Sequence, residues 1–329
     1  MNREPMTREH SEMISGLIAM VIAEREPSVD FSQKELKAAK HRFTEEELEI
    51  LREQERFDGD LEKFLTVQWF VDALELESVA DEEYIRQFFR NARKLDINWF
   101  YDNLYMKEIQ VPKKKVGNFQ LGTAVYEKGE FFQYDMPDFS RVPVVPKIGF
   151  FDGKIQFPSI YEGVTPWMSI CPSEIFSMEQ PIQDAFGRVL VLGLGLGYYP
   201  FMISKFDHVK EIVIVERQKE VIELFNNYLL PQFSHKEKIK VVQSDAFAYM
   251  EELECDQGFG ADEGGPFDFC FADIWENQVD GAKAYRKIKE HEVRLPKTKF
   301  SYWIEESILW QLRLESEEES YGRSADFGG

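Results

Sequence analysis

Residues 189 to 200 read VLVLGLGLGYYP. Four apolar residues, predicted to form a buried strand, run directly into Gly193, Gly195 and Gly197, and Pro200 follows. Glycines after a strand let the backbone approach a ligand without Cβ atoms in the way. Pro200 suits the first turn of a helix, where a missing N–H costs nothing. The stretch therefore predicts a strand, a ligand-binding turn, and a helix whose N-terminal N–H groups point at the ligand.

The second half of the chain alternates strand-like with helix-like stretches around this turn. Short runs rich in Val, Ile and Phe are followed by longer amphipathic runs. Such alternation is typical of a parallel sheet covered by helices on both faces. Because only 25 residues follow position 304, the sheet is expected to stop at five strands. We predict a Rossmann-like doubly wound α/β sheet with strands at 188–193, 211–216, 238–245, 267–273 and 299–304.

The first part of the chain is predicted to be helical. Two capping boxes, Ser32 with Glu35 and Thr44 with Glu47, mark helix starts. The apolar run at 13–23 is too short to span a bilayer and has acidic residues on both sides. A signal peptide requires a basic leader, so the run is interpreted as the buried face of a first helix.

The segment that joins the two halves is rich in proline, glycine and β-formers. Asp152-Gly153 and Lys128-Gly129 each lie between two strand-like runs, which predicts two hairpins. The Gly- and acid-rich stretch at 254–265 is predicted to be a surface loop. The predicted domains are a helical domain at 1–107, a small β-rich linker unit at 108–165, a Rossmann-like domain at 166–314 and an acidic, Gly-rich tail at 315–329.

The composition excludes several classes of protein. The formal net charge is −21 and no basic patch is present, whereas nucleic-acid binders need cations to neutralise phosphates. The acidic surface also disfavours anionic membranes. Three cysteines without a C-x-x-C pair fit a reducing, cytoplasmic setting better than a disulfide scaffold. No metal-ligand spacing is present, and we expect a small-molecule substrate.

Acidic residues end the second, third and fourth predicted strands. Glu216 lies 19 residues past Gly197, where a carboxylate can accept both hydroxyls of a ribose. Asp245 can accept from an adenine amino group while the N–H of Ala246 reaches a ring nitrogen, and Asp245 also fits as a plain helix N-cap. Asp273 ends the fourth strand. Since the carboxyl ends of parallel strands share one edge, these acids and the glycine turn are expected to form one site.

The nicotinamide fingerprint G-x-G-x-x-G would place a glycine where this chain has Tyr198. That glycine is needed for close packing of the helix on the strand. A nicotinamide dehydrogenase is therefore the least favoured of the functions considered.

The four motifs VLVLGLGLGYYP, IVIVER, VVQSDAF and FDFCFADIW resemble the successive motifs of class I S-adenosylmethionine-dependent methyltransferases. Within this class they are most similar to the spermidine-synthase-like branch, in which a β-unit also precedes the nucleotide domain. The resemblance covers residues 166 to 304. The chain departs from it after Asp273, because Glu276 stands where aminopropyltransferases have a second Asp.

The resemblance implies S-adenosyl-L-methionine as the cofactor, with the glycines along its methionine part, Glu216 at the ribose and Asp245 at the adenine. Asp273 and Glu276 are the implied catalytic residues, because they either take a proton from the acceptor or attract a cationic amine. Glu174 and Met178 lie where residues upstream of the first strand approach the cofactor. The full set of implied cofactor-binding residues is Gly193, Leu194, Gly195, Gly197, Tyr198, Glu216, Arg217, Asp245, Ala246, Glu174 and Met178.

Three functions remain open at this point. The first is methyl transfer from S-adenosylmethionine to a small molecule, which requires mainly alignment of the acceptor and exclusion of water. The second is aminopropyl transfer from decarboxylated S-adenosylmethionine. The third is binding of the cofactor without catalysis. The helical domain is expected to cover the site or to form a homodimer.

Overall fold

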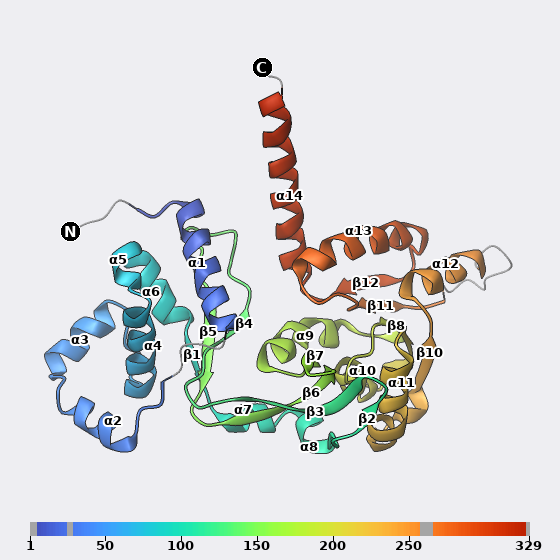
Figure 1. Ribbon diagram of the computed structural model, residues 1–329, viewed down its shortest axis with the longest axis horizontal. Coiled ribbons are helices and arrows are strands. Elements are labelled where there is room, and N and C mark those ends of the chain that lie inside the picture. Colours follow the sequence, from blue (N-terminus) through green and yellow to red (C-terminus); the bar gives the residue numbers. More distant parts are fainter. Residues whose placement is uncertain (1–4, 25–28, 257–265, 327–329) are drawn as a thin grey trace. The chain divides into compact units, whose positions relative to one another are not determined.

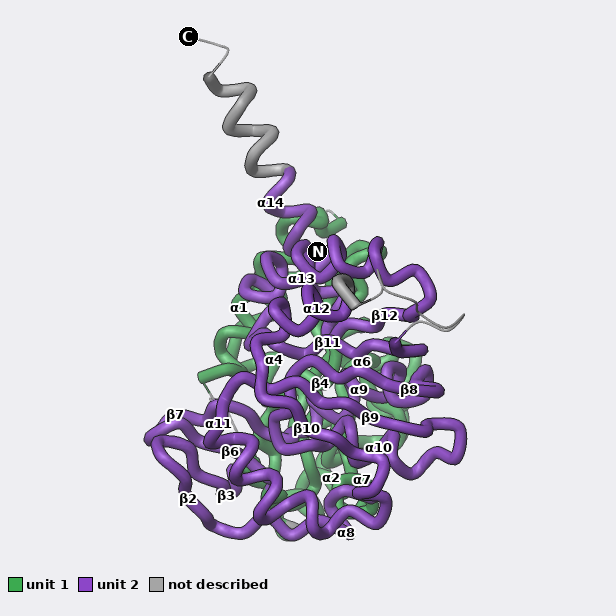
Figure 2. The backbone as a smooth tube through the Cα atoms, turned by 90° about the vertical axis from the view of Figure 1, so that its right-hand side faces the viewer, with its two compact units in different colours: residues 1–102, 125–156 green, residues 103–124, 157–329 purple. Residues whose placement is uncertain are grey.

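A computed structural model describes residues 5–24, 29–256 and 266–326. The chain divides into two compact units, one of residues 1–102 with 125–156 and the other of residues 103–124 with 157–329 (Figure 2). This division differs from the predicted one, because the expected β-rich unit at 108–165 is shared between the two. The predicted loop at 254–265 lies mostly outside the described residues.

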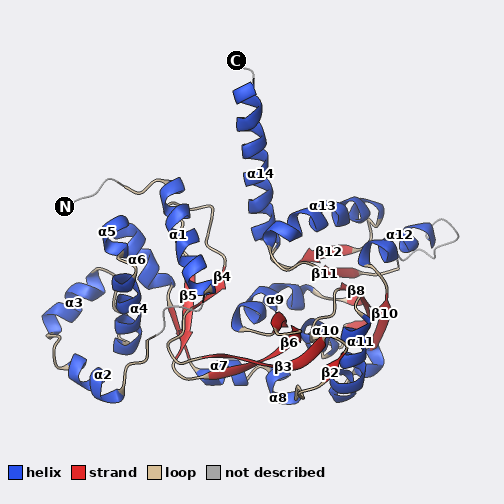
Figure 3. Cartoon of the chain, in the orientation of Figure 1, coloured by secondary structure: helices blue, strands red, loops and turns tan. Residues whose placement is uncertain are grey.

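The first unit combines helices with a small sheet (Figure 3). Both predicted capping boxes are present, at the starts of α2 and α3. The sheet has the strand order β1-β5-β4, with β1 parallel to β5 and β4 antiparallel to it. Its elements are α1 (Arg8–Ala23), α2 (Gln33–Lys40), α3 (Glu45–Glu53), α4 (Leu61–Ala73), α5 (Leu76–Val79), α6 (Glu82–Asn91), β1 (Arg93–Leu95), α7 (Ile97–Tyr101), β4 (Phe132–Asp135) and β5 (Lys147–Phe151).

Helix α1 contains the early apolar run and buries one face of it. Ile14 and Ile18 are buried in the core of the unit, which confirms the sequence interpretation. On other positions of the helix, Met13, Leu17 and Met20 are 57%, 55% and 64% exposed. A homodimer through this helical region stays a prediction. Within the described residues, none of the helices combines the length and the apolar character needed to cross a membrane.

Both predicted hairpins are wrong. Strand β5 pairs with β1 and β4, whereas β6 (Ile155–Glu162) belongs to another sheet, so Asp152-Gly153 does not join paired strands. Asp152 Oδ1 instead accepts a hydrogen bond from Ile97 N at 3.2 Å. Strand β3 (Phe119–Tyr126), before Lys128-Gly129, likewise lies in a different sheet from β4. A turn signal acts on a few residues only, whereas strand pairing is decided by burial along the whole strand.

The second unit opens with a short helix and a four-stranded sheet. The sheet has the order β2-β3-β6-β7, and the pairs β2–β3 and β6–β7 are antiparallel. Trp167 of β7 packs edge-on against Phe119 of β3, with ring centroids 5.4 Å apart. The elements not yet placed are α8 (Leu104–Glu108), β2 (Lys115–Val116) and β7 (Thr165–Ser169).

The rest of this unit is a five-stranded parallel sheet of order β10-β9-β8-β11-β12, with helices along both faces (Figure 1). This is the predicted doubly wound sheet. The strand order reverses between β8 and β11, where such sheets bind ligands. Its elements are α9 (Pro172–Asp184), β8 (Gly187–Leu192), α10 (Tyr198–Ser204), β9 (Val209–Glu216), α11 (Lys219–Leu224), a π-helical turn (Phe225–Leu229), 3-10 turns (Leu230–Gln232 and Lys236–Lys238), β10 (Ile239–Gln243), α12 (Ala246–Asp256), β11 (Phe269–Ala272), α13 (Gln278–Arg294), β12 (Lys299–Tyr302) and α14 (Glu305–Asp326).

Alternate residues of these strands pack into opposite layers. Leu190, Leu192 and Cys270 share a core cluster with Met250 of α12 and Ile288 of α13. On the other face, Phe271 stacks on Tyr199 of α10 at a centroid distance of 4.0 Å. Side chains alternate across a strand, so each strand contributes to both layers. Because both faces of the sheet are covered, the strand sequences are continuous apolar runs.

The segment predicted as an acidic, Gly-rich tail at 315–329 is helical up to residue 326. Helix α14 extends from Glu305 to Asp326. Arg286 of α13 donates to Glu315 of α14 at 2.8 Å. The helix begins with EESILWQLRL, which is rich in Leu, and continues through four Glu residues at 315 and 317–319; Leu and Glu are both good helix formers.

Gly197→Ala is expected to lower the stability of the second unit. Gly197 has φ +74°, and a Cβ there would lie 2.4 Å from Phe225 Cε2. Backbone strain and this overlap together predict a loss of about 2 kcal/mol or more. Gly16 is a matched control, since no atom lies within 4 Å of its added Cβ. Gly16→Ala in α1 should raise stability by about 0.5–1 kcal/mol. Urea unfolding followed by circular dichroism measures both, and equal effects would contradict the packing role of Gly197.

Candidate functional site

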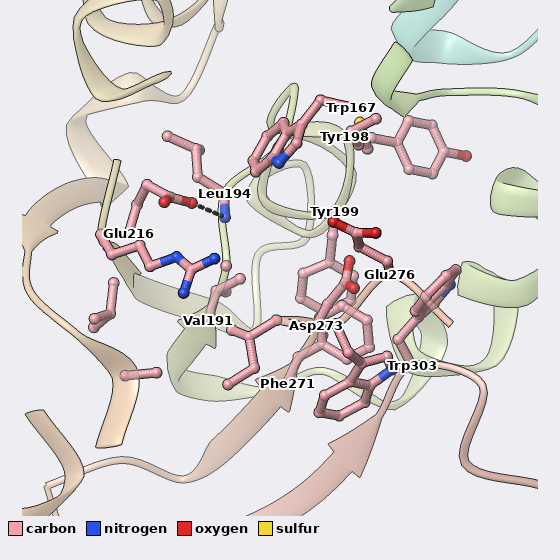
Figure 4. A pocket seen from close by; sticks show the side chains of 18 of the residues that line it. Trp167, Val191, Leu194, Tyr198, Tyr199, Glu216, Phe271, Asp273, Glu276 and Trp303 are labelled. Atoms are coloured by element: carbon pink, nitrogen blue, oxygen red, sulfur yellow. Dashed lines mark hydrogen bonds between the residues drawn. The ribbon is translucent and has the colours of Figure 1, made fainter. Parts of the chain in front are cut away.

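A cavity of about 860 Å³ lies in the second unit at the carboxyl ends of the parallel strands. Its walls come from the segments that follow β8, β9, β10 and β11, from α9 and α10, and from β7. Glu216 and Leu194 lie at one end, and Asp273, Glu276 and Trp303 lie together at the other (Figure 4). The cavity therefore occupies the switch point of the sheet, where the motifs predicted a ligand.

The glycine turn brings three strand ends together. Gly193 has φ +98°, and a Cβ on it would lie 1.9 Å from the backbone oxygen of Asp273. Gly193 N donates to Val215 O at 2.9 Å, and Leu194 N donates to Glu216 Oε2 at 3.2 Å. Glycine is required here because any side chain would separate the end of β8 from the segment after β11.

Glu216 is a buried carboxylate at the end of the cavity near Leu194. It is 6% exposed, and its Oε1 accepts from Gln218 N at 2.7 Å. Burial raises its pKa, while the backbone donors Gln218, Leu194 and Arg217 act in the opposite direction. Arg217 also lines the cavity. A carboxylate fixed by main-chain donors in this way still has lone pairs to accept ribose hydroxyls.

Asp245 caps a helix and lines the cavity at the same time. Its Oδ1 accepts from Phe247 N at 2.9 Å and from Ala248 N at 3.2 Å, at the start of α12. Asp245 is exposed, and Ala246 beside it also lines the cavity. Both sequence interpretations of Asp245 are thus compatible, since Oδ2 is left to accept from a ligand.

Two acids without partners face each other at the other end of the cavity. Glu174 in the first turn of α9 is 9% exposed, and Asp273 is partly buried. Neither side chain has a hydrogen bond or ion pair with another described residue. Burial and the charge of Asp273 raise the pKa of Glu174 well above its usual value, and burial and Glu216 raise the pKa of Asp273 to about 7. Carboxyl groups in such a place either keep a proton or need a positive charge beside them to ionise.

Aromatic side chains complete this end of the cavity. Trp303 follows β12, and its Nε1 donates to Ser177 Oγ at 2.8 Å. Trp167 on β7 and Tyr198 on α10 contribute further wall, and Asn103 Nδ2 donates to the Tyr198 hydroxyl at 2.9 Å. Trp167 and Trp303 were missed from the sequence, because no local pattern shows which surface a distant hairpin or the last strand will cover.

The structure gathers the predicted residues into one wall with a single exception. Gly197 does not line the cavity; it starts α10 in a left-handed conformation and leaves room for Phe225. The other predicted residues all line it, namely Gly193, Leu194, Gly195, Tyr198, Glu216, Arg217, Asp245, Ala246, Glu174, Met178, Asp273 and Glu276.

The charge of the wall is strongly one-sided. Arg217 is the single basic residue among those that line the cavity, against the acids Glu162, Glu174, Glu216, Asp245, Asp273 and Glu276. Across the part of the chain that the structure describes, no group of three or more His, Cys, Asp or Glu residues is arranged to hold a metal ion. The excess of negative charge in the wall favours a cationic ligand.

Comparison with known proteins finds one family model that covers part of the second unit. The family model described as spermine/spermidine synthase domain matches residues 177–285. That span includes the glycine turn, Glu216, Asp245 and Asp273, and it confirms the resemblance to the spermidine-synthase-like branch over these residues. No curated protein sequence matches the chain.

One similar solved structure is a spermidine synthase in complex with the transition state analogue AdoDATO. It is 15% identical over 40% of this chain and 48% of that chain, with a TM-score of 0.28. The similarity thus spans about half of the length of that protein.

Asp245→Asn is expected to separate the two roles of Asp245. Asn caps helices about as well as Asp, so the melting temperature should stay close to that of the wild type. With the amide oxygen used by the cap, the NH₂ group would face the amino group of adenine and weaken binding of the expected ligand S-adenosylmethionine, or of its decarboxylated form, about tenfold or more. Calorimetric titration measures this, and unchanged affinity would show that adenine does not bind at Asp245.

Asp273→Asn is expected to stabilise the ligand-free protein at high pH. A carboxyl whose pKa is raised in the folded state binds its proton more tightly there, so stability falls as pH rises from about 4 towards about 7. The variant should melt above the wild type at pH 8 and close to it at pH 4. The control is Glu276→Gln, at an exposed acid. Its melting temperature should differ from that of the wild type by the same small amount at both pH values. A variant that melts below the wild type at pH 8 would contradict the account.

Proposed function

We propose that the chain transfers an aminopropyl group from decarboxylated S-adenosylmethionine to an amine. The proposal rests on one observation, the two unpartnered carboxyl groups of Glu174 and Asp273 in a cavity wall with six acids and one base. Decarboxylated S-adenosylmethionine carries a sulfonium and an ammonium, and its acceptor is also an amine. The family match to residues 177–285 supports the same choice.

Methyl transfer from S-adenosylmethionine, which the motifs first suggested, fits this wall less well. That molecule has a carboxylate at the end of its methionine part, and this end would enter the region of Glu174 and Asp273. Like charges in a desolvated site cost several kcal/mol. The proposal therefore puts aminopropyl transfer before methyl transfer, whereas the sequence had favoured methyl transfer.

The residues of the site have distinct tasks in this reaction. Glu216 accepts hydrogen bonds from the ribose, and Asp245 accepts one from the adenine. The glycine turn lets the donor lie close to the main chain of the protein. When bound, the sulfonium supplies an activated carbon. The acceptor nitrogen attacks that carbon, an N–C bond forms, and the C–S bond breaks with its electron pair moving to sulfur. Methylthioadenosine leaves, and the proton lost by the nitrogen passes to the carboxylate of Asp273.

The carboxylate of Asp273 suits the task of base because its pKa is raised to about 7 by burial and by the charge of Glu216. A base is most effective when its pKa lies near the working pH. The aromatic walls, including Trp303 and Tyr198, exclude water from the reacting atoms.

A product assay tests the proposal. The protein is incubated with either donor and a panel of aliphatic monoamines and diamines, and the adenosyl products are separated by chromatography. We expect methylthioadenosine from the decarboxylated donor and a rate that falls as pH is lowered below about 7, as Asp273 takes up its proton. Asp273→Asn should reduce the rate about 100-fold or more with little change in donor affinity.

Two outcomes would overturn the proposal. Faster formation of S-adenosylhomocysteine from S-adenosylmethionine would restore methyl transfer. Tight donor binding with no product from any amine would favour a binding protein without catalysis.

A further inference from the structure

Glu174 is a second buried acid to which the chemical step assigns no task. It lies in the first turn of α9, after the N-cap Cys171, and lines the cavity at 9% exposure. An acid at this helix position often serves the helix dipole alone. Here burial outweighs any such effect, because the pKa of Glu174 is raised rather than lowered. Its carboxyl has no hydrogen bond or ion pair with another described residue, so it is available to a ligand.

The titratable groups around Glu174 are all acidic. Asp273 faces it from the segment after β11, Tyr198 from α10, and Cys171 from the residue before α9. No cation among the residues that line the cavity balances this group, since Arg217 is at the other end, beside Glu216. The surroundings thus leave Glu174 to be neutralised by a proton or by a positive group of the ligand.

The main chain at Glu174 is held from two sides. Ser177 Oγ donates to Glu174 O at 2.9 Å, and the same hydroxyl accepts from Trp303 Nε1 at 2.8 Å. This chain of two hydrogen bonds connects the first turn of α9 to the segment after β12. A carboxyl on a main chain fixed in this way presents its charge at a defined place.

The glycine turn contributes no charge to this end of the cavity. Its lining members Gly193, Leu194 and Gly195 have no ionisable side chain. The charge that meets the three-carbon arm of the donor must therefore come from other elements. Asp273 is assigned to the acceptor nitrogen, and Glu276 is exposed to solvent. Glu174 is therefore the buried acid that remains for the arm.

We infer that Glu174 selects the donor by pairing with the ammonium of its aminopropyl arm and repelling a carboxylate at the same carbon. This inference rests on the proposed function. The two donors differ only in that carboxylate, so one buried negative charge beside it discriminates strongly. A hydrogen-bonded pair of charges at this site also fixes the arm for attack by the acceptor.

Calorimetric titration of the full chain with three ligands tests the inference. The ligands are decarboxylated S-adenosylmethionine, S-adenosylmethionine and methylthioadenosine, which has neither the ammonium nor the carboxylate. The wild type should prefer the decarboxylated donor about 100-fold or more. Glu174→Gln should weaken that donor about 10- to 100-fold, reduce the preference by a similar factor, and leave methylthioadenosine unchanged. Glu179→Gln, an exposed acid on the same helix that does not line the cavity, should keep the preference.

The outcomes separate the inference from the proposed function. A wild type that prefers S-adenosylmethionine would overturn the proposed function itself. A wild type that prefers the decarboxylated donor, with the same preference in Glu174→Gln, would overturn only the role of Glu174. If Glu174→Gln also binds methylthioadenosine more weakly, the titrations are repeated with Glu174→Asp. This variant keeps the negative charge but moves it back by the length of one methylene group. A reduced preference in Glu174→Asp supports the inference, and the wild-type preference contradicts it.

Discussion

The close approach of Gly193 to Asp273 is the contact on which the site depends. No side chain fits between them, because a Cβ on Gly193 would lie 1.9 Å from the oxygen of Asp273. Asp273 N donates to Leu192 O at 2.9 Å, which fixes the segment after β11 against the end of β8. On the opposite side of the turn, Glu216 Oε2 accepts from Leu194 N. The same turn thus determines where the Glu216 end and the Asp273 end of the cavity lie, and a substituted Gly193 would move both.

Much of this arrangement follows from sequence, and the exceptions have a common cause. The parallel sheet and the acids Glu216, Asp245 and Asp273 were predictable, because strand-end positions in a doubly wound fold share one edge. The hairpin expected at Asp152-Gly153 was not found, since β5 takes the remote strand β1 as its partner. Trp303 escaped detection for the same reason. Local patterns report turns and helix starts, whereas strand partners and cavity walls depend on contacts between distant segments.

Charge, rather than fold, distinguishes the candidate reactions. A doubly wound sheet with a glycine turn binds adenosyl ligands of several kinds, so the fold alone does not assign a reaction. The cavity adds two carboxyl groups with raised pKa values, the buried Glu174 and the partly buried Asp273, and no cation lies beside them among the residues that line the cavity. In the ligand-free protein this arrangement costs stability as the pH rises. Under the proposed function, the dicationic donor removes that cost when it binds.

Proton release on binding tests this electrostatic account most directly. Decarboxylated S-adenosylmethionine is titrated into the protein at pH 7 in two buffers of different ionisation enthalpy, and the difference in heat gives the number of protons exchanged. Because the ammonium favours the ionised form of carboxyl groups whose pKa is raised in the free protein, we expect net release of protons on binding. Methylthioadenosine, which has no charge, should release far less. Binding of the cation without proton release, or equal release by both ligands, would contradict the account.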